Sequence, residues 1–312
     1  MKKAALISLL LSMLFVGWWF FFQYNQHTNI LAKGIYARIP IEFIRDNALI
    51  EVEIEGKKYP IKLDLGAACQ FTFFREALEN ISEKQFVEFI TTTDIKGNQY
   101  KVSSYSVPLI KIKNLKCKNV EILEESRDFV TKGAVLWRLN DQKNSQIPFI
   151  GRVGRDCFRS NNLFMDFPNS MIFVTSSIDE LKKDHWPICE LFEASFEMGR
   201  WGIILSIETD IGVKRFVLDT AANASILRES HLHIPLTKEV IPERQVFTTT
   251  KFAIGGHDFG PLDLSLFEMT PSVDADGLLG LDFLKKYAIY LDFENNKAFI
   301  GPSSKVCGAI IF

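Results

Sequence analysis

The chain has 312 residues, 47% of them hydrophobic, and a formal net charge of −2. This length allows one or two domains with sizeable cores, and the near-neutral charge without a basic patch argues against a nucleic-acid-binding protein. Five cysteines, an odd number without CxxC spacing, exclude a disulfide-rich scaffold but leave one bridge possible.

The N-terminal segment is the first element with a clear pattern. Lys2 and Lys3 precede a charge-free run over residues 4–22 that ends in five aromatic residues. As a helix this run would reach roughly 28 Å, close to the hydrocarbon thickness of a bilayer. No small-residue cleavage site follows, so we expect a retained transmembrane helix 4–22 within an anchor and tether at 1–38. The rest of the chain would be extracytoplasmic; the alternative is a secreted or periplasmic protein after signal cleavage.

Two aspartates lie in matching settings further along the chain. An apolar, β-type run delivers Asp64 into a turn of small residues that starts at Gly66, after one intervening leucine, and a similar run over 216–218 delivers Asp219. A charge at the end of a buried strand is costly. Two carboxylates held face to face can share one proton, because like charges at contact distance do not both ionise cheaply. This pattern indicates an acid-type hydrolase.

The segments that follow each aspartate also repeat. Residues 151–174 align with 277–300 at a constant offset of 126, with seven identical pairs out of 24, and residues 112–122 match 254–264 at an offset of 142. Asp-Phe-x-Asn between two apolar runs predicts a hairpin in each copy. We therefore predict two homologous β-rich lobes, residues 39–177 and 196–312, joined by a linker at 178–195.

The falling offsets locate insertions in the first lobe. Thirteen extra residues follow Asp64 and cover residues 91–100, where Lys96-Gly97-Asn98 predicts a hairpin tip with Tyr100 on the returning strand. Sixteen more cover residues 123–146, a polar stretch that predicts a surface loop. Short helices are expected at 82–89, 178–184 and 282–287.

With these residues the chain resembles the aspartic proteases of the pepsin-type bilobal or retropepsin-like fold, over about residues 40–301. Residues 276–284, and less closely 150–154, are similar to the apolar-apolar-Gly segment that packs beside each catalytic loop in that family. The resemblance implies a mainly β, acid-protease-like fold with a pseudo-two-fold axis, here preceded by one transmembrane helix. It also implies that Asp64 and Asp219 activate water and that the hairpin at Gly97, Asn98 and Tyr100 is a substrate-covering flap.

The two aspartate loops depart from the family's Asp-Thr/Ser-Gly motif. Residues 64–66 read Asp-Leu-Gly, and residues 219–221 read Asp-Thr-Ala. In the family the two hydroxyls reach across to the backbone of the opposite loop. The resemblance therefore implies that Thr220 supplies half of this clasp and Leu65 none. Ala221 stands where a glycine would let backbone N–H groups approach the carboxylate closely.

Three functions remain open at this point. The first is a membrane-anchored aspartic endopeptidase, favoured at acidic pH, that acts through Asp64 and Asp219. The second is a degenerate protease-like module that binds extended polypeptide between its lobes without cutting it, and the third is a structural extracytoplasmic domain. The expected partners are a polypeptide in the cleft and the membrane, with no nucleic acid. We expect no cofactor and no metal, since His231 and His233 lack a third ligand nearby.

Overall fold

The computed structural model describes residues 34–44, 46–126, 149–188, 190–231 and 245–303. The predicted membrane helix 4–22, most of its tether and most of the predicted loop 123–146 lie outside these ranges. Among the described residues, no helix has the length and apolar character needed to cross a bilayer. All of the described residues belong to the unit Gly34–Phe312.

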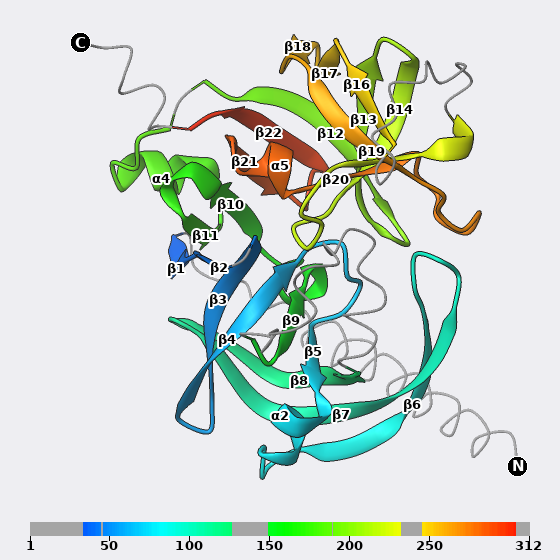
Figure 1. Ribbon diagram of the computed structural model, residues 1–312. Helices are drawn as coiled ribbons and strands as arrows, with labels where there is room; N and C mark the ends of the chain where they lie inside the picture. Colours follow the sequence, from blue (N-terminus) through cyan, green and yellow to red (C-terminus); the bar gives the residue numbers. More distant parts are fainter. Residues whose placement is uncertain (1–33, 45, 127–148, 189, 232–244, 304–312) are drawn as a thin grey trace, which may run out of the picture. The chain divides into compact units, whose positions relative to one another are not determined.

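The described chain is mainly β, as the sequence predicts (Figure 1). We use first lobe for the part that holds β1 to β11 and second lobe for β12 to β22. The first lobe contains β1 (Ile35–Pro40), β2 (Glu42–Ile44), β3 (Asn47–Ile54), β4 (Lys57–Asp64), β5 (Phe71–Phe74), α2 (Arg75–Glu79), β6 (Gln85–Thr93), β7 (Gln99–Ile112), β8 (Leu115–Glu125), β9 (Gly151–Gly154), η2 (Arg155–Cys157), β10 (Asn162–Asp166), η3 (Phe167–Asn169) and β11 (Met171–Thr175).

Helix α4 (Ile178–Lys183) follows the first lobe. The second lobe contains β12 (Phe192–Gly199), β13 (Gly202–Thr209), β14 (Gly212–Leu218), β15 (Ile226–Arg228), η4 (Glu229–His231), β16 (Val246–Thr249), β17 (Phe252–Ile254), β18 (His257–Asp258), β19 (Leu262–Phe267), β20 (Gly277–Leu279), α5 (Leu281–Leu284), β21 (Tyr287–Asp292) and β22 (Lys297–Pro302). The exact limits of the lobes and linker stay a prediction.

The strands form two sheets. An eight-stranded sheet in the first lobe has the order β2-β3-β4-β9-β5-β8-β7-β6. A fourteen-stranded sheet has the main path β1-β11-β10-β21-β22-β12-β13-β14-β20-β15-β19-β16, with β17 and β18 attached through β13. The second sheet therefore contains strands of both lobes, which meet where β10 pairs with β21.

The strand pairings of the first lobe recur in the second at the offsets read from the sequence. Three examples are Leu49 opposite Lys62 and Ile204 opposite Val217; Ser104 opposite Leu123 and Val246 opposite Ser265; and Leu63 opposite Val153 and Leu218 opposite Leu279. The first strands repeat as well, because β1 pairs with β11 as β12 pairs with β22. Since register is specified wherever one face of a sheet is buried, this agreement extends the repeat from sequence to structure.

The apolar alternation of the strands accounts for the core. On β3, Ile50, Val52 and Ile54 are buried while the residues between them are partly exposed, the pattern of a strand with one covered face. The main cluster of buried side chains includes residues of both lobes, among them Leu63, Leu65 and Leu218. The strands that deliver the two aspartates therefore end in one continuous core.

Two local predictions need correction. Residues 82–89 do not form a helix: strand β6 begins at Gln85 and pairs with β7 over its whole length, and the only helix of this region is α2. Aromatic and β-branched residues such as Phe86 and Val87 suit a strand, and the ladder to β7 decides their conformation. The loop placed at 123–146 begins too early, since β8 continues to Glu125. The other two helices are confirmed as α4 and α5, α5 starting one residue earlier and ending sooner than expected.

Candidate active site

Each aspartate lies at the carboxyl end of a strand, beside a glycine at the end of the neighbouring parallel strand. Asp64 ends β4 and pairs with Gly154 of β9. Asp219 directly follows β14, whose Leu218 pairs with Leu279, the residue before Gly280. A Cβ on Gly154 would meet the carbonyl oxygen of Cys69 at 2.3 Å, and one on Gly280 would meet the Ala224 carbonyl carbon at 2.6 Å. These two positions therefore need glycine, because any side chain would collide with the backbone of the segment that follows each aspartate.

The two aspartate loops face each other. A Cβ placed on Gly66 in the first loop would lie 2.9 Å from Cγ of Asp219 in the second. The hydroxyl of Thr220 donates a hydrogen bond to the carbonyl oxygen of Leu63 (3.1 Å) and accepts one from the backbone N–H of Leu65 (2.9 Å). The structure thus brings the sequence-predicted residues of both loops together.

Backbone N–H groups orient both carboxylates. The N–H of Ala67 donates to Oδ1 of Asp64 at 3.1 Å, and the N–H of Ala221 donates to Oδ1 of Asp219 at 2.8 Å, with Ala222 adding a longer bond of 3.3 Å. The alanine at position 221 therefore still supplies the N–H that the resemblance assigned to a glycine. Hydrogen bonds of this kind fix a carboxylate in one plane.

The clasp between the loops is asymmetric. Thr220 is fully buried and makes both of its hydrogen bonds to the first loop, as the sequence implies. Leu65 makes no return bond with its side chain, which instead lies fully buried in the main core. Lys62 reaches across in its place, with Nζ donating to the carbonyl oxygen of Ala221 at 3.0 Å. A lysine and a threonine, not two hydroxyls, connect the loops.

A second cross-lobe contact comes from Arg155, which is almost fully buried after β9. Its Nη1 donates to the carbonyl oxygen of Gly66 at 3.1 Å, and its Nη2 donates to that of Arg200 in the second lobe at 2.9 Å. Since guanidinium donors have a fixed geometry, Arg155 ties the first aspartate loop to the β12–β13 turn.

Asp64 also carries an ion pair. Nη1 of Arg152 donates to its Oδ2 at 2.6 Å, while Nε of the same guanidinium donates to Oε2 of Glu125 at 3.0 Å. Glu125 is 5% exposed, and the hydroxyl of Thr72 donates to it at 2.6 Å. Although burial alone would lower it, the charges of Glu125 and Asp64 hold the pKa of Arg152 above its ordinary value.

The two aspartates differ in their surroundings. Burial, and then the negative charge of Asp64, raise the pKa of Asp219 to about 6. Burial also lowers the pKa of Lys62, against the opposing charges of both aspartates. A carboxyl group whose pKa is raised by burial and by a second carboxylate is the arrangement expected of a pair that shares one proton.

The solved structures that share this fold include an aspartic proteinase and a globulin. Aspartic proteinase from Irpex lacteus aligns with a TM-score of 0.57 over 86% of this chain and 97% of its own, at 11% identity. Basic 7S globulin from soybean aligns with a TM-score of 0.61 over 89% and 97%, also at 11% identity. The chain has the fold of the pepsin-like aspartic proteases. No family model and no curated protein matches its sequence.

At this identity the likeness concerns the aspartic-protease-like fold alone. One of the two similar structures is named a proteinase and the other a globulin, so the chemistry of this chain has to be argued from its own residues.

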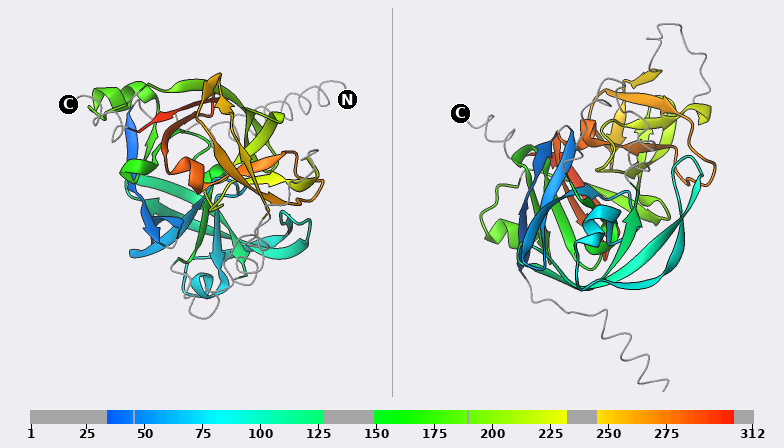
Figure 2. Two further views of the ribbon diagram at one scale, coloured as in Figure 1. Left: turned by 45° about the horizontal axis from the view of Figure 1, so that its top comes forward. Right: turned by 60° about the horizontal axis from the view of Figure 1, so that its bottom comes forward.

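The predicted flap hairpin exists and its tip reaches the second lobe (Figures 1 and 2). Strands β6 and β7 are joined at residues 94–98, where Gly97 has a φ of +88°. The Asp94 carboxylate holds the tip by accepting bonds from the backbone N–H groups of Lys96 and Asn98, the Asn98 amide and the Tyr100 hydroxyl. Asn98 and Tyr100, two residues selected from the sequence, therefore stabilise the tip. Both do so through Asp94, which the sequence did not single out.

The tip docks on the loop that follows β19. The N–H of Thr270 donates to the carbonyl oxygen of Ile95 at 3.0 Å. The Ile95 side chain packs on a cluster of the second lobe that includes Val217, Met269 and Leu278. Residues 94–98 therefore bridge from the first lobe to the second.

Cys69, close to Asp64 in sequence, is not a nucleophile candidate. Burial raises the pKa of its thiol to about 12, so the thiol stays neutral. The one bridge left possible by the sequence has a geometric counterpart elsewhere: Cys117 and Cys157 are both free, and their sulfur atoms lie 3.7 Å apart.

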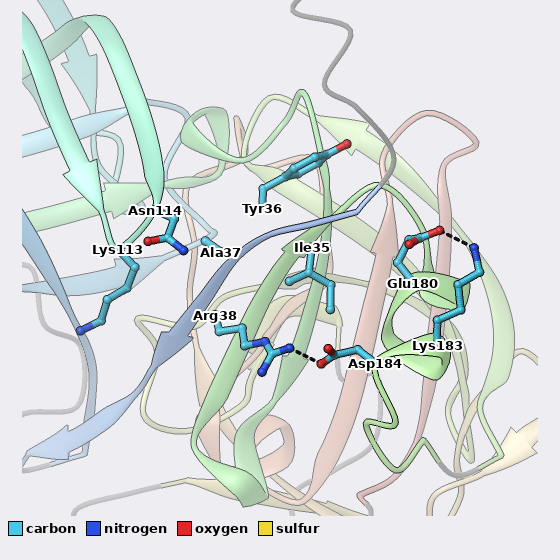
Figure 3. Close-up of a pocket in the computed structure, with 9 residues that line it drawn as sticks. All are labelled: Ile35, Tyr36, Ala37, Arg38, Lys113, Asn114, Glu180, Lys183 and Asp184. Carbon is cyan, nitrogen blue, oxygen red and sulfur yellow. Dashed lines mark hydrogen bonds and ion pairs between the residues drawn. The ribbon is translucent and has the colours of Figure 1, made fainter.

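A cavity of about 570 Å³ lies away from the aspartates, between β1, the β7–β8 turn and α4 (Figure 3). Its charged side chains are paired, Arg38 with Asp184, Lys183 with Glu180, and Lys113 with Glu51 outside the cavity. It contains no residue of either aspartate loop and gives no reason to move the candidate site.

The sequence analysis missed the charged residues around Asp64, although a signal was present. In the repeat, Lys62 and Arg152 are equivalent to Val217 and Leu278. A charged residue at a position where the other copy is apolar indicates that the surroundings of the two aspartates differ.

Proposed function

We propose that this chain is an aspartic endopeptidase that hydrolyses peptide bonds with the Asp64–Asp219 pair. The observation that carries the proposal is the contact of the two aspartate loops, in which Gly66 lies against the Asp219 carboxyl group. Asp64 is 3% exposed, and the pKa of Asp219 is raised by burial and by Asp64. Such a pair can hold one proton between two carboxylates at mildly acidic pH.

The chemistry needs one carboxyl group in each protonation state. The ionised one accepts a proton from a water molecule, whose oxygen then attacks the peptide carbonyl carbon. The protonated one donates to the carbonyl oxygen, and a proton passes to the amine as the carbon–nitrogen bond breaks. The hairpin tip at Gly97 and Asn98, docked on the second lobe, would have to lift for an extended polypeptide to enter.

The decisive experiment incubates the full-length protein with a mixed peptide pool between pH 3 and pH 7 and identifies new termini by mass spectrometry. Cleavage should be lost in both Asp64→Asn and Asp219→Asn. A matched control is Asp46→Asn, which changes an aspartate on the surface of the first lobe. Cleavage that persists in either site variant would show that another group is responsible.

A degenerate binding module is the second candidate, and Leu65 is the observation that favours it. Its side chain lies in the core, so the clasp lacks the hydroxyl of the first loop. This function predicts that the wild-type protein binds extended peptides without cleaving them anywhere in that pH range. The structural-domain alternative depended on aspartates that lie far apart, whereas the two loops are in contact.

We also propose that residues 4–22 hold the protein in a membrane with both lobes outside the cytoplasm. This rests on the sequence pattern alone. Mass spectrometry of the purified protein should find the original N-terminus, and a reporter fused to the C-terminus should be active only outside the cytoplasm. A mature N-terminus beyond Gln26 would indicate a cleaved signal peptide instead.

A further inference from the structure

The two lobes differ in charge on the paired strands that lead to the aspartates. Lys62 and Arg152 face each other across β4 and β9 in the first lobe, and Val217 and Leu278 face each other at the equivalent place in the second. The strand pairing around them repeats, and so does the glycine beside each aspartate. Two cationic side chains therefore lie on the strands that lead to Asp64. At the equivalent positions before Asp219 the side chains are apolar.

Each cation has a defined contact. Arg152 bridges the Asp64 and Glu125 carboxylates, and Glu125 is held in turn by Thr72. Lys62 donates to the Ala221 carbonyl oxygen on the opposite loop, next to Asp219. Asp219 accepts bonds only from backbone N–H groups among the hydrogen bonds found in the described residues. An ionised guanidinium therefore touches one aspartate and not the other.

The charges that face the pair can be counted within the described part of the chain. They come from β4, β8, β9, η2 and the two loops: Lys62, Asp64, Cys69, Glu125, Arg152, Arg155, Asp156 and Asp219. Lys62 and Arg152 balance Asp64 and Glu125, Arg155 has Asp156 beside it, and the Cys69 thiol is neutral. Asp219 makes no ion pair with any of these groups, although the charge of Lys62 also acts on it.

We propose that Arg152 gives the two aspartates fixed and different roles, with Asp64 the ionised general base and Asp219 the carrier of the proton. Arg152 is a positioning residue in this arrangement, since it acts through Asp64. The burial and the neighbouring charge that raise the pKa of Asp219 to about 6 act in the same direction. Each Asp64 oxygen accepts one bond and has a free lone pair, so a water molecule can still bind there.

The assignment rests on the proposed function and completes its proton transfers. Asp64 removes a proton from water as the new carbon–oxygen bond forms, and Asp219 gives its proton to the carbonyl oxygen, which leaves a neutral diol. As the carbon–nitrogen bond breaks, Asp64 passes its proton to the amine nitrogen and Asp219 recovers one from the diol. Both carboxyl groups return to their starting states.

The test is a titration that needs no activity. Full-length protein labelled with 13C at the aspartate carboxyl carbons is followed by NMR from pH 3 to pH 8, and Asp64→Asn and Asp219→Asn identify the two signals. The signal of Asp219 should be the one that moves with a midpoint near 6. If the Asp64 signal moves there and the Asp219 signal does not, the roles are reversed and the proposal is wrong.

Two variants of opposite charge effect make the test sharper. Arg152→Leu, which installs the residue of the second lobe, should let the Asp64 signal take over part of the change near pH 6 that the Asp219 signal shows alone in the wild type. Arg152→Lys should restore most of the wild-type pattern. Glu125→Gln should lower the midpoint of the Asp219 signal, because it removes a nearby anion and leaves Arg152 on Asp64. Arg75→Leu, which breaks the exposed ion pair with Glu124 on the same strand, is the matched control and should leave it unchanged.

A titration that is unchanged in both Arg152→Leu and Glu125→Gln would overturn the proposal. Should Arg152→Leu fail to fold, Glu125→Gln alone still tests it through the predicted downward shift. If the two signals titrate as expected but the protein cleaves no peptide, the proposed endopeptidase activity is wrong. The assignment of the proton to Asp219 would still hold.

Discussion

A methyl group on Gly66 would lie 2.9 Å from Cγ and 3.0 Å from Oδ1 of Asp219. The first aspartate loop is therefore a wall of the pocket that holds the second aspartate. Such a distance is shorter than real Cβ contacts, so a side chain at this position has to displace the carboxyl group.

Gly66→Ala should reduce kcat/KM for peptide cleavage by about 100-fold, since small misplacements of reacting groups have costs of this size. The midpoint of thermal unfolding should change little, because the contact is at the site and not in the core. Gly34→Ala is the control, since a methyl group there meets nothing within 4 Å. Wild-type kinetics in Gly66→Ala would mean that Asp219 is not held at this place.

Thr220→Val should destabilise the fold. The change leaves the Leu65 N–H and the Leu63 carbonyl oxygen without their partner in a fully buried place, a loss of about 1–3 kcal/mol in the free energy of unfolding. Urea unfolding measures it. Thr248→Val removes a hydroxyl that bonds Asp263 on the exposed surface, and should cost well under half as much.

Asp219→Asn should stabilise the protein at neutral pH. The pKa of Asp219 is raised to about 6 in the fold, so its ionised form opposes folding above that pH and its protonated form does not below about pH 4. The gain is on the order of 1–3 kcal/mol above pH 6 and should vanish towards pH 4. Thermal unfolding at several pH values checks this, and a gain that does not depend on pH would contradict it.

Asp94→Ala should loosen the tip of the β6–β7 hairpin. The variant removes the acceptor of the Lys96, Asn98 and Tyr100 bonds. The tip would keep only its backbone bonds and the contacts of Ile95 with the second lobe. Amide hydrogen exchange over residues 94–100 should become at least tenfold faster, since each lost bond lowers the local opening free energy by about 1 kcal/mol. Asp258→Ala, which removes two backbone bonds in the second lobe, should leave the exchange of this segment unchanged.

The features that sequence reasoning found are those that repeat. The three offsets between the lobes are confirmed by register, because two copies of one pattern constrain each other more strongly than any single segment does. Lys96-Gly97-Asn98 predicts a hairpin tip because glycine readily adopts the positive φ that many turns need, and Gly97 does so.

The features that it missed depend on contacts between distant segments. Lys62 is 159 positions from Ala221 and Arg152 is 88 positions from Asp64, so nothing local indicates either bond. The helix predicted at 82–89 is wrong because a short apolar run does not distinguish a helix from a strand, and pairing with β7 decides the conformation from Gln85 onward.

Phe164 and Tyr290 lie opposite each other where β10 meets β21, and they are equivalent residues of the two lobes at the offset of 126. A local two-fold axis passes between them, as in an isologous dimer of identical chains. In such a dimer every side chain occurs twice, so a cation beside one aspartate would also stand beside the other. Covalent connection of the halves removes this constraint. A single chain can therefore carry lysine and arginine before one aspartate and valine and leucine at the equivalent positions before the other. The two aspartates are then free to differ, one as the acid and one as the base.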